Sequence, residues 1–168
     1  DGRARRAHPK TALVLGRLYP RETEAGMEAS SKEIVRAAPE TRLPVRPETI
    51  RRLLVIRPGG IGDAVLLIPF LRQLKAAFPV VGIDVLAERR NLDLFRLLSD
   101  TVRCCDAYDA SPAWLLPRLQ QRAYDLVFDS EQYHHLSAWV ATATRAPVRV
   151  GFDTNPRRNR CYTALVPY

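Results

Sequence analysis

The sequence predicts an α/β domain with a parallel sheet and flanking helices. The first indication is an apolar run, Leu53–Ile56, followed by three glycines within four positions and then by a helical pattern. The second is that short apolar runs alternate with helical segments through the rest of the chain, at intervals of roughly ten to twenty residues. Such alternation is typical of right-handed βαβ units, in which a helix connects each strand to the next.

Each predicted strand is a short run of apolar residues bounded by turn residues. The predicted strands are Leu53–Ile56, Ile83–Ala87, Val102–Tyr108, Leu126–Phe128 and Val148–Val150. Helices are expected between them, after Gly62 and over Asn91–Leu98, Ala113–Gln121 and Leu136–Thr144. The end of the chain, Leu165–Tyr168, matches no element, and truncation is expected there.

The first predicted helix has apolar residues three or four positions apart, which indicates one face packed on the sheet. These residues are Val65, Ile68, Leu71, Leu74 and Phe78. Pro69 lies among them and has no backbone N–H to donate. We therefore expect a kink, or a helix that starts late, near Pro69.

Residues 1–50 differ from the rest and are predicted to be a flexible basic leader with one weak helix near Ser31–Ala37. Met27 is the only methionine, so a start there would make residues 1–26 an artefact. The net charge is +8, and residues 1–52 contribute +5 of it through 12 basic and 7 acidic residues. A basic chain favours anionic partners without choosing among them.

Several protein classes are disfavoured by composition. The chain has three cysteines that form no CxxC pair, which indicates a reduced, cytoplasmic protein. No stretch approaches the ~20 apolar residues of a membrane span, and no signal peptide is present. The basic segments lack the interleaved aromatic residues of single-strand binding, so no nucleic-acid partner is predicted.

The first candidate site is the loop Gly59, Gly60, Gly62 and Asp63, at the expected ligand-binding edge of the sheet. A dinucleotide fingerprint would need a third glycine where Val65 stands, and no Walker A motif is present. A carboxylate at the helix start also argues against a bound pyrophosphate. Asp63 is suited to be a general base, and an equally open alternative is that it caps the helix.

The second candidate site follows the fourth strand and contains Asp129, Glu131, His134 and His135. The carboxyl ends of parallel strands lie at one edge, so this segment is expected to face the same cleft as Asp63. Adjacent histidines without a third ligand do not predict a metal site and are more consistent with solvated loop residues. Asp129 has a simpler alternative role as the cap of the next helix.

The third candidate site is a group of arginines around the fifth strand, comprising Arg145, Arg149, Arg157, Arg158 and Arg160. Arginines on a loop after a buried strand suit bidentate binding of a carboxylate or phosphate. The alternative is a solvated basic face, which is the more common role of clustered charges.

Three blocks of the sequence together resemble glycosyltransferase family 9, the lipopolysaccharide heptosyltransferases and their relatives. The first block is LLVIRPGGIGDAVLLIPFLRQLKAAFP (53–79), the second is YDLVFDSEQYHHLSAW (124–139), and the third is RAPVRVGFD (145–153). Their order and spacing also agree, and the resemblance covers roughly residues 52–168. In the second block, His134 and His135 stand where many relatives have an arginine or small residues, which leaves the acceptor and the donor sugar open.

The resemblance implies that residues 51–168 are the Rossmann-like, acceptor-side N-terminal half of a GT-B architecture, without its C-terminal domain. It implies inverting transfer from a nucleotide-sugar, typically ADP-heptose, to a lipid-linked glycan, with no metal and no cofactor. Asp63 matches the proposed general base. Arg149 and the Arg157, Arg158 and Arg160 cluster match the region for the acceptor's anionic groups, with Asp129 and Glu131 in the same cleft. A cytoplasmic enzyme, peripheral at the inner membrane, is expected.

Two other functions remain open. One is a nicotinamide-dependent oxidoreductase in which Glu88, after the second strand, would bind the ribose hydroxyls; Val65 and Asp63 disfavour it. The other is a non-catalytic anion-binding module that uses the arginines alone. This 168-residue piece is expected to have little or no transferase activity by itself, because one domain cannot assemble a transition state that lies between two.

Overall fold

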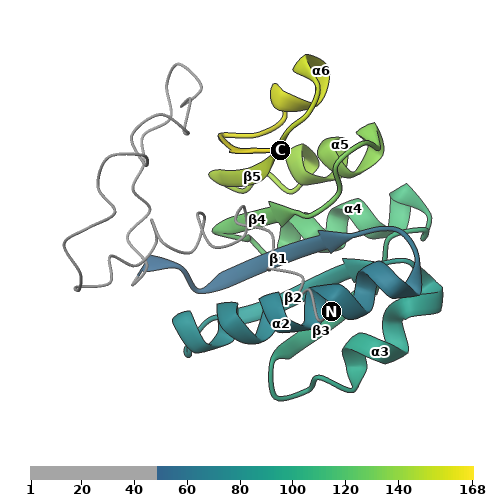
Figure 1. Cartoon of the computed structure of the whole chain (residues 1–168), viewed down its shortest axis with the longest axis vertical. Coiled ribbons are helices and arrows are strands. Elements are labelled where there is room, and N and C mark those ends of the chain that lie inside the picture. The colour runs from purple at the N-terminus through teal and green to yellow at the C-terminus, as the bar shows by residue number, and fades with distance from the viewer. Residues whose placement is uncertain (1–48) are drawn as a thin grey trace, which may run out of the picture.

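Six parallel strands form the centre of the structure, in the order β3-β2-β1-β4-β5-β6 (Figure 1). They are β1 (Arg52–Arg57), β2 (Gly82–Ala87), β3 (Val102–Ala107), β4 (Leu126–Asp129), β5 (Val148–Asp153) and β6 (Ala164–Pro167). This computed structural model describes residues 49–168. The predicted leader, with Met27 and the weak helix at Ser31–Ala37, lies outside the described residues apart from its last two positions.

Helices connect the strands and cover both faces of the sheet, as the α/β prediction requires. They are α2 (Ile61–Ala77), the 3₁₀ turn η2 (Arg89–Asn91), α3 (Leu92–Arg96), α4 (Pro112–Gln121), α5 (His135–Ala143) and the single turn α6 (Pro156–Asn159). The predicted Rossmann-like α/β class and the five predicted strands are confirmed, with boundaries that move by one to three residues.

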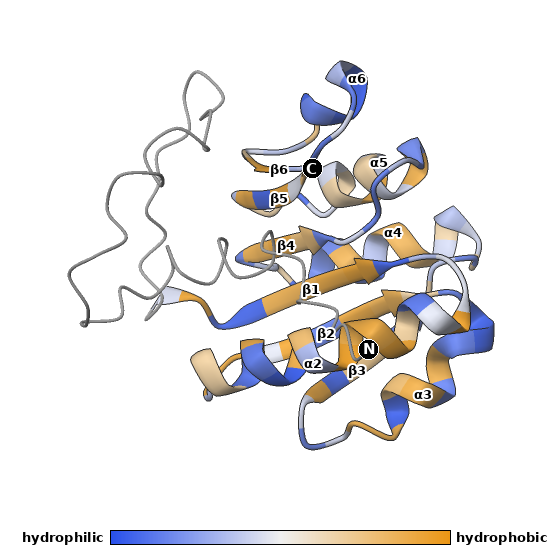
Figure 2. Cartoon of the chain, in the orientation of Figure 1, coloured by the Kyte–Doolittle hydropathy of each residue, from blue (hydrophilic) through white to orange (hydrophobic). Residues whose placement is uncertain are grey.

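Two hydrophobic clusters hold the layers together, one on each face of the sheet. The first includes Leu53, Val55, Ile83, Val85, Leu71 and Phe95 beneath α2 and α3. The second includes Leu54, Ile56, Leu86, Val127, Leu119 and Ala138 beneath α4 and α5. Figure 2 shows this apolar content along the central strands. Successive residues of β1 belong to opposite clusters, since side chains alternate across a strand that is buried on both sides.

The expectation for α2 is partly wrong. The helix begins at Ile61, so it does not start late, and Pro69 lies within it. Its buried residues include Leu71 and Leu74 as predicted, whereas Val65 is 47% exposed. Pro69 is also on the exposed side, where water can satisfy the Val65 carbonyl that the proline leaves without its helical partner.

The expectation that Leu165–Tyr168 forms no element is wrong, because β6 occupies Ala164–Pro167 and pairs in parallel with β5. Four residues ending in a proline give a weak strand signal, and such strands occur at sheet edges. Gly151 of β5 also lies close to the side chain of Tyr162, two residues before β6 begins. A Cβ there would lie 2.4 Å from the Tyr162 ring.

Candidate functional site

The strand order reverses between β1 and β4, and this reversal defines where a ligand can enter. Strands β2 and β3 lie on one side of β1, and β4, β5 and β6 on the other. In open α/β sheets a crevice forms outside the carboxyl ends of the strands at such a switch point. The loops after β1 and β4 contain the glycine segment and the Asp129–His135 segment, so both candidate sites lie at the carboxyl edge of neighbouring strands.

The glycine loop is anchored through its first glycine. Gly59 has a φ of +114°, a backbone conformation that residues other than glycine rarely adopt. Its N–H donates to Glu88 Oε1 at 2.9 Å, and its carbonyl accepts from Asn91 Nδ2 at 2.8 Å. The other Glu88 oxygen pairs with Arg90 at 2.7 Å. The segment after β2 therefore holds the glycine loop in place, and both carboxylate oxygens of Glu88 are already bound.

Gly60 and Gly62 have no comparable structural requirement. Gly60 is the N-cap of α2 with a φ of −70°, and a Cβ at either position would meet no described atom within 4 Å. The space over the first turn of α2 is thus open, and the free N–H groups of a helix start point into such a space. These two glycines leave room for a group to approach the backbone closely.

Asp63 lies in the first turn of α2, beside this open space. Because Gly60 is the N-cap and no side-chain cap is formed, the interpretation of Asp63 as the cap is wrong. Its Oδ2 forms an ion pair with Arg57 Nη2 at 2.8 Å, and half of its side chain stays exposed, against 13% for Arg57. The carboxylate is therefore held on one side and accessible on the other.

Arg57 is a site residue that the sequence analysis missed. It is the last residue of β1, and its Nη1 donates to the Ser130 carbonyl at 2.8 Å. One guanidinium thus joins the glycine loop to the loop after β4. The available signal was a basic residue ending the first buried strand, immediately before the glycines.

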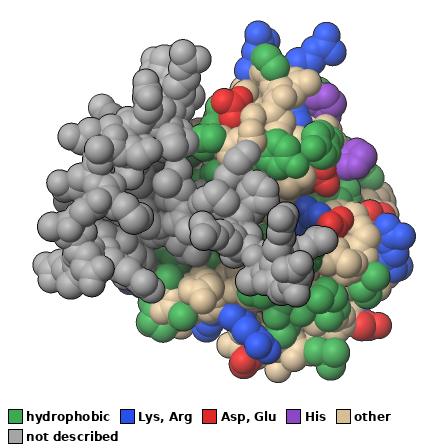
Figure 3. All heavy atoms as spheres, in the orientation of Figure 1, with side chains coloured by type: hydrophobic (Ala, Val, Ile, Leu, Met, Phe, Trp, Pro, Cys, Tyr) green, Lys and Arg blue, Asp and Glu red, His purple; other side chains and the backbone are tan. Residues whose placement is uncertain are grey.

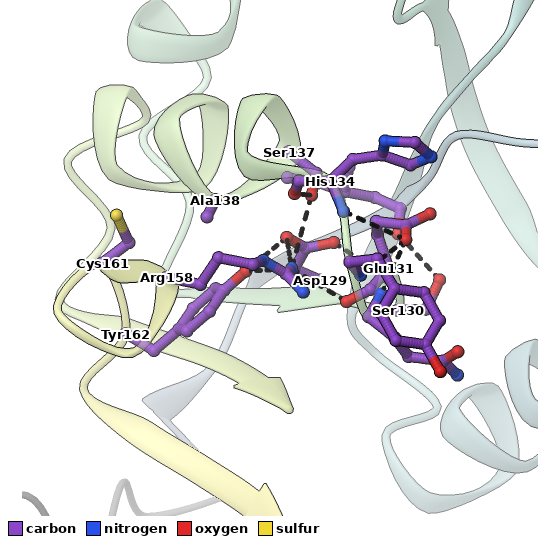
Figure 4. Close-up of polar contacts among 12 residues, drawn as sticks. Asp129, Ser130, Glu131, His134, Ser137, Ala138, Arg158, Cys161 and Tyr162 are labelled. Atoms are coloured by element: carbon purple, nitrogen blue, oxygen red, sulfur yellow. Dashed lines mark hydrogen bonds and ion pairs between the residues drawn. The ribbon is translucent and has the colours of Figure 1, made fainter. Parts of the chain in front are cut away.

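Asp129 is fully buried and belongs to a network drawn in Figure 4. Its Oδ2 accepts from Tyr162 Oη at 2.5 Å and from Arg158 Nη2 at 3.1 Å, and its Oδ1 accepts from the Glu131 N–H at 3.0 Å. Burial raises the pKa of Asp129 above its usual range, although hydrogen bonds from Tyr162 and Ser137 oppose this shift. The interpretation of Asp129 as a helix cap is wrong, since the N-cap of α5 is His134.

Glu131 shapes the loop after β4. Its Oε1 accepts the N–H groups of Gln132 at 2.9 Å and Tyr133 at 2.8 Å, with His134 at 3.4 Å. Burial alone would raise its pKa, but these three backbone donors hold the pKa of Glu131 below its usual range. Glu131 is only 7% exposed, so it fixes the loop backbone from within.

The arginine group is divided between the interior and the surface. Arg158 is fully buried, and its Nη2 also donates to the Glu131 carbonyl at 2.8 Å. Arg149 donates to the backbone carbonyls of Cys161 at 2.8 Å and Ala146 at 2.6 Å. The remaining members, Arg145, Arg157 and Arg160, are exposed. In Figure 3 basic side chains stand over α6 at the top of the molecule.

His134 and His135 are exposed at the start of α5 and are the purple side chains in Figure 3. Within residues 49–168, no group of three or more His, Cys, Asp or Glu side chains could hold a metal ion.

Buried polar atoms without a hydrogen-bond partner among the described residues are concentrated at this edge. They include Arg57 Nε, Arg158 Nε and Nη1, Asn91 Oδ1 and Tyr108 Oη. Burial, together with the negative charges of Asp129 and Glu131, raises the pKa of Tyr108. Unpaired buried donors are costly and call for an explanation. The guanidinium groups of Arg57 and Arg158 therefore each retain an unused hydrogen-bond donor.

Comparison with family models and with curated proteins finds no match to this sequence. Three solved structures are similar in fold. The E. coli ADP-heptose lps heptosyltransferase II is 23% identical, with a TM-score of 0.59 over 68% of this chain and 34% of that chain. The E. coli heptosyltransferase WaaC with ADP is 24% identical, with a TM-score of 0.54 over 66% and 39%. The glycosyl transferase family 9 structure from Veillonella parvula is 18% identical, with a TM-score of 0.51 over 61% and 32%.

This chain therefore spans between about a third and two fifths of the length of the structures that it matches. The resemblance to glycosyltransferase family 9 in the sequence blocks extends to the fold of the domain that contains them.

Proposed function

We propose that this chain is the acceptor-side domain of an inverting glycosyltransferase. The complete enzyme would transfer a heptose or related sugar from a nucleotide-sugar, such as ADP-heptose, to a lipopolysaccharide core or related glycan. The observation that carries the proposal is Asp63, a half-exposed carboxylate in the first turn of α2 that is held by Arg57 at the switch point. The fold likeness to heptosyltransferases supports it.

In the proposed reaction Asp63 accepts the proton of an acceptor hydroxyl while that oxygen attacks C1 of the donor sugar. The new O–C1 bond forms on the face opposite the leaving group. The bond from C1 to the phosphate oxygen breaks, and ADP leaves with the electron pair. Asp63 needs open space in front of it for this geometry, and Gly60 and Gly62 provide it. The proposed reaction requires no metal and no cofactor.

The predicted acceptor-binding residues then have two kinds of role. Arg157 and Arg160 are exposed and suited to contact anionic acceptor groups directly. Asp129, Glu131 and Arg158 act indirectly, because they are buried and fix the loop after β4. Arg149 is bound to backbone carbonyls and is assigned the same indirect role.

The proposal places the enzyme in the cytoplasm, peripheral to the inner membrane where lipid-linked acceptors reside. Within residues 49–168, no helix combines the length and the apolar content that crossing a bilayer requires. A second, donor-binding domain completes the proposed active enzyme, and this domain by itself is expected to be inactive.

A transferase assay tests the proposal by measuring ADP release from ADP-heptose with a Kdo-containing core acceptor, using the complete gene product. Asp63→Asn keeps the shape of the side chain and removes the base, so kcat is expected to fall by about 10²–10⁴-fold. Asp93→Asn, which removes an exposed charge on α3, is the matched control and should leave kcat unchanged. No ADP release by the wild-type protein would refute the transferase, and full turnover by Asp63→Asn would refute the assigned base.

The non-catalytic anion-binding module is not favoured, because Arg158, one of the arginines it would use, is fully buried and bound to Asp129. It predicts that Asp63→Asn leaves anion affinity intact. The nicotinamide-dependent alternative is not favoured. Its proposed ribose ligand, Glu88, is bound to the Gly59 N–H, and the third glycine of the fingerprint is Val65.

A further inference from the structure

We infer that Arg57 is a positioning residue that sets the orientation of the Asp63 carboxylate relative to the sheet. It does so by bridging the first turn of α2 and the loop after β4. What Asp63 does in a reaction depends on the function proposed above. The bridge itself is a property of the folded domain and can be tested separately.

The Arg57 guanidinium contacts both segments of the bridge directly. Arg57 ends β1, where it pairs with Ala87 of β2, and the residue before it, Ile56, also pairs with Asp129 of β4. Two nitrogens of one guanidinium make two contacts, Nη2 to Asp63 Oδ2 and Nη1 to the Ser130 carbonyl, each at 2.8 Å. Because the guanidinium is planar and rigid, two such contacts fix both the distance and the direction between their partners.

The far end of the bridge, the Ser130 carbonyl, is itself held in place. The Ser130 N–H and Oγ both donate to the Ile56 carbonyl, at 3.0 and 2.8 Å. The next residue is held through its N–H by Asp129 and through its carbonyl by Arg158. The Ser130 carbonyl is thus a fixed acceptor. Through Arg57, the position of the Asp63 carboxylate depends on the sheet and on the loop after β4 as well as on α2.

An ion pair with a half-exposed partner contributes little to stability, about 0–1 kcal/mol. Arg57 is only 13% exposed and leaves its Nε buried without a partner among the described residues, and an unsatisfied buried donor is unfavourable for folding. A gain in stability therefore does not explain why Arg57 is buried at this position. Its role in fixing the Asp63 carboxylate does explain it.

A double-mutant cycle in the ADP-heptose assay separates positioning from direct binding. Arg57→Gln is expected to lower kcat about 10–100-fold with a smaller change in KM, since it leaves the base present but misdirected. If Arg57 acts through Asp63, adding Arg57→Gln to Asp63→Asn causes no further loss. Arg57→Lys keeps the charge without the planar fork and should recover only part of kcat. If the kcat losses of the two single variants multiply in the double variant, or if Arg57→Gln changes KM alone, the inference is overturned.

Amide hydrogen exchange without any substrate provides a second readout. Arg57→Gln is expected to speed exchange at least several-fold in both loops, residues 59–62 and 130–134. Arg96→Gln, which removes the exposed Arg96–Asp93 pair, is the matched control and should leave both loops unchanged. If the wild-type protein releases no ADP, the proposed function fails and exchange still decides the role of Arg57. Unchanged exchange in both loops would then overturn the bridge.

Discussion

Two buried clusters in this domain use the same three residue types. We call them the α4 cluster (Asp84, Arg122, Tyr124), because Arg122 caps α4, and the α5 cluster (Asp129, Arg158, Tyr162), because Arg158 also donates to Ser137 of α5. In each, a fully buried aspartate accepts a hydrogen bond from a buried tyrosine, at 2.8 Å in the α4 cluster and 2.5 Å in the α5 cluster. In each, an arginine supplies the opposite charge.

The clusters differ in what their remaining hydrogen bonds hold. The α4 cluster connects regular elements: Asp84 also pairs with Arg103 of β3 at 2.5 Å, and Arg122 pairs with Asp106 of the same strand. The α5 cluster instead binds both the N–H and the carbonyl of Glu131, in the loop beside the candidate site. The same three residue types connect strands in one place and hold the backbone of the loop after β4 in the other.

The largest expected difference between the clusters concerns their arginines. Arg158→Met leaves Asp129 buried without its cation and should reduce the free energy of unfolding by about 3–5 kcal/mol. Arg103→Met removes the arginine of β3 that pairs with Asp84 of the α4 cluster and is 46% exposed. Asp84 keeps Arg122 and Tyr124, so a loss below about 1 kcal/mol is expected. Urea denaturation measures both, and equal losses would mean that the clusters are energetically alike.

The tyrosines separate stability from function. Tyr162→Phe and Tyr124→Phe each remove a buried hydroxyl that donates to an aspartate, so each should cost roughly 1–3 kcal/mol of unfolding free energy. Only Tyr162→Phe is expected to speed amide exchange in residues 130–134 of the folded protein, because only its cluster holds that loop. Faster exchange in this loop with Tyr124→Phe would show that the loop responds to global stability instead.

The glycine loop offers a similar contrast within four residues. Gly59→Ala forces a Cβ into a backbone with a φ of +114° and should lose about 1–2 kcal/mol of unfolding free energy. Gly60→Ala should change stability by less than about 0.5 kcal/mol, because a Cβ there meets open space among the described residues. Gly60→Ala is instead expected to raise KM in the transferase assay. Its failure to affect KM would mean that no ligand approaches this backbone.

The sequence predicts the local parts of this structure better than the distant pairings. Periodicity reports which residues are buried, so five strands and the edge that holds Asp63 could be found. The α5 cluster could not, because the Asp129–Arg158 pair joins residues 29 positions apart and depends on how β4, α6 and the intervening loop pack. For the same reason five arginines were expected to act together, whereas Arg158 is buried and Arg157 beside it is exposed.

Arg57 illustrates another kind of limit. A single arginine at the end of an apolar strand has no distinctive spacing, and its importance comes from two partners that lie 6 and 73 positions away. Asp63 was singled out because a carboxylate follows the glycines at a helix start, where a phosphate-binding loop would leave space for an anion. Its held geometry, however, is visible only in the folded chain.

The smallest expected effect concerns pH and tests how the α5 cluster's loop is fixed. Backbone donors lower the pKa of Glu131, so its contribution to stability is complete above the unfolded pKa of about 4.3 and is lost as pH falls through the folded pKa. Glu131→Gln should therefore destabilise the protein slightly near neutral pH, because the amide does not carry the charge that the backbone donors stabilise.

The measurement is urea denaturation of the wild-type protein and Glu131→Gln between pH 7 and roughly pH 3, the range that spans the carboxylate titrations. Asp129 has a raised pKa and works in the opposite direction, losing its contribution as pH rises, but it is present in both proteins and cancels in the difference. The gap between the two should narrow as pH falls below about 4.3. A gap that stays constant would mean that the side-chain shape of Glu131, rather than its charge, holds the loop after β4.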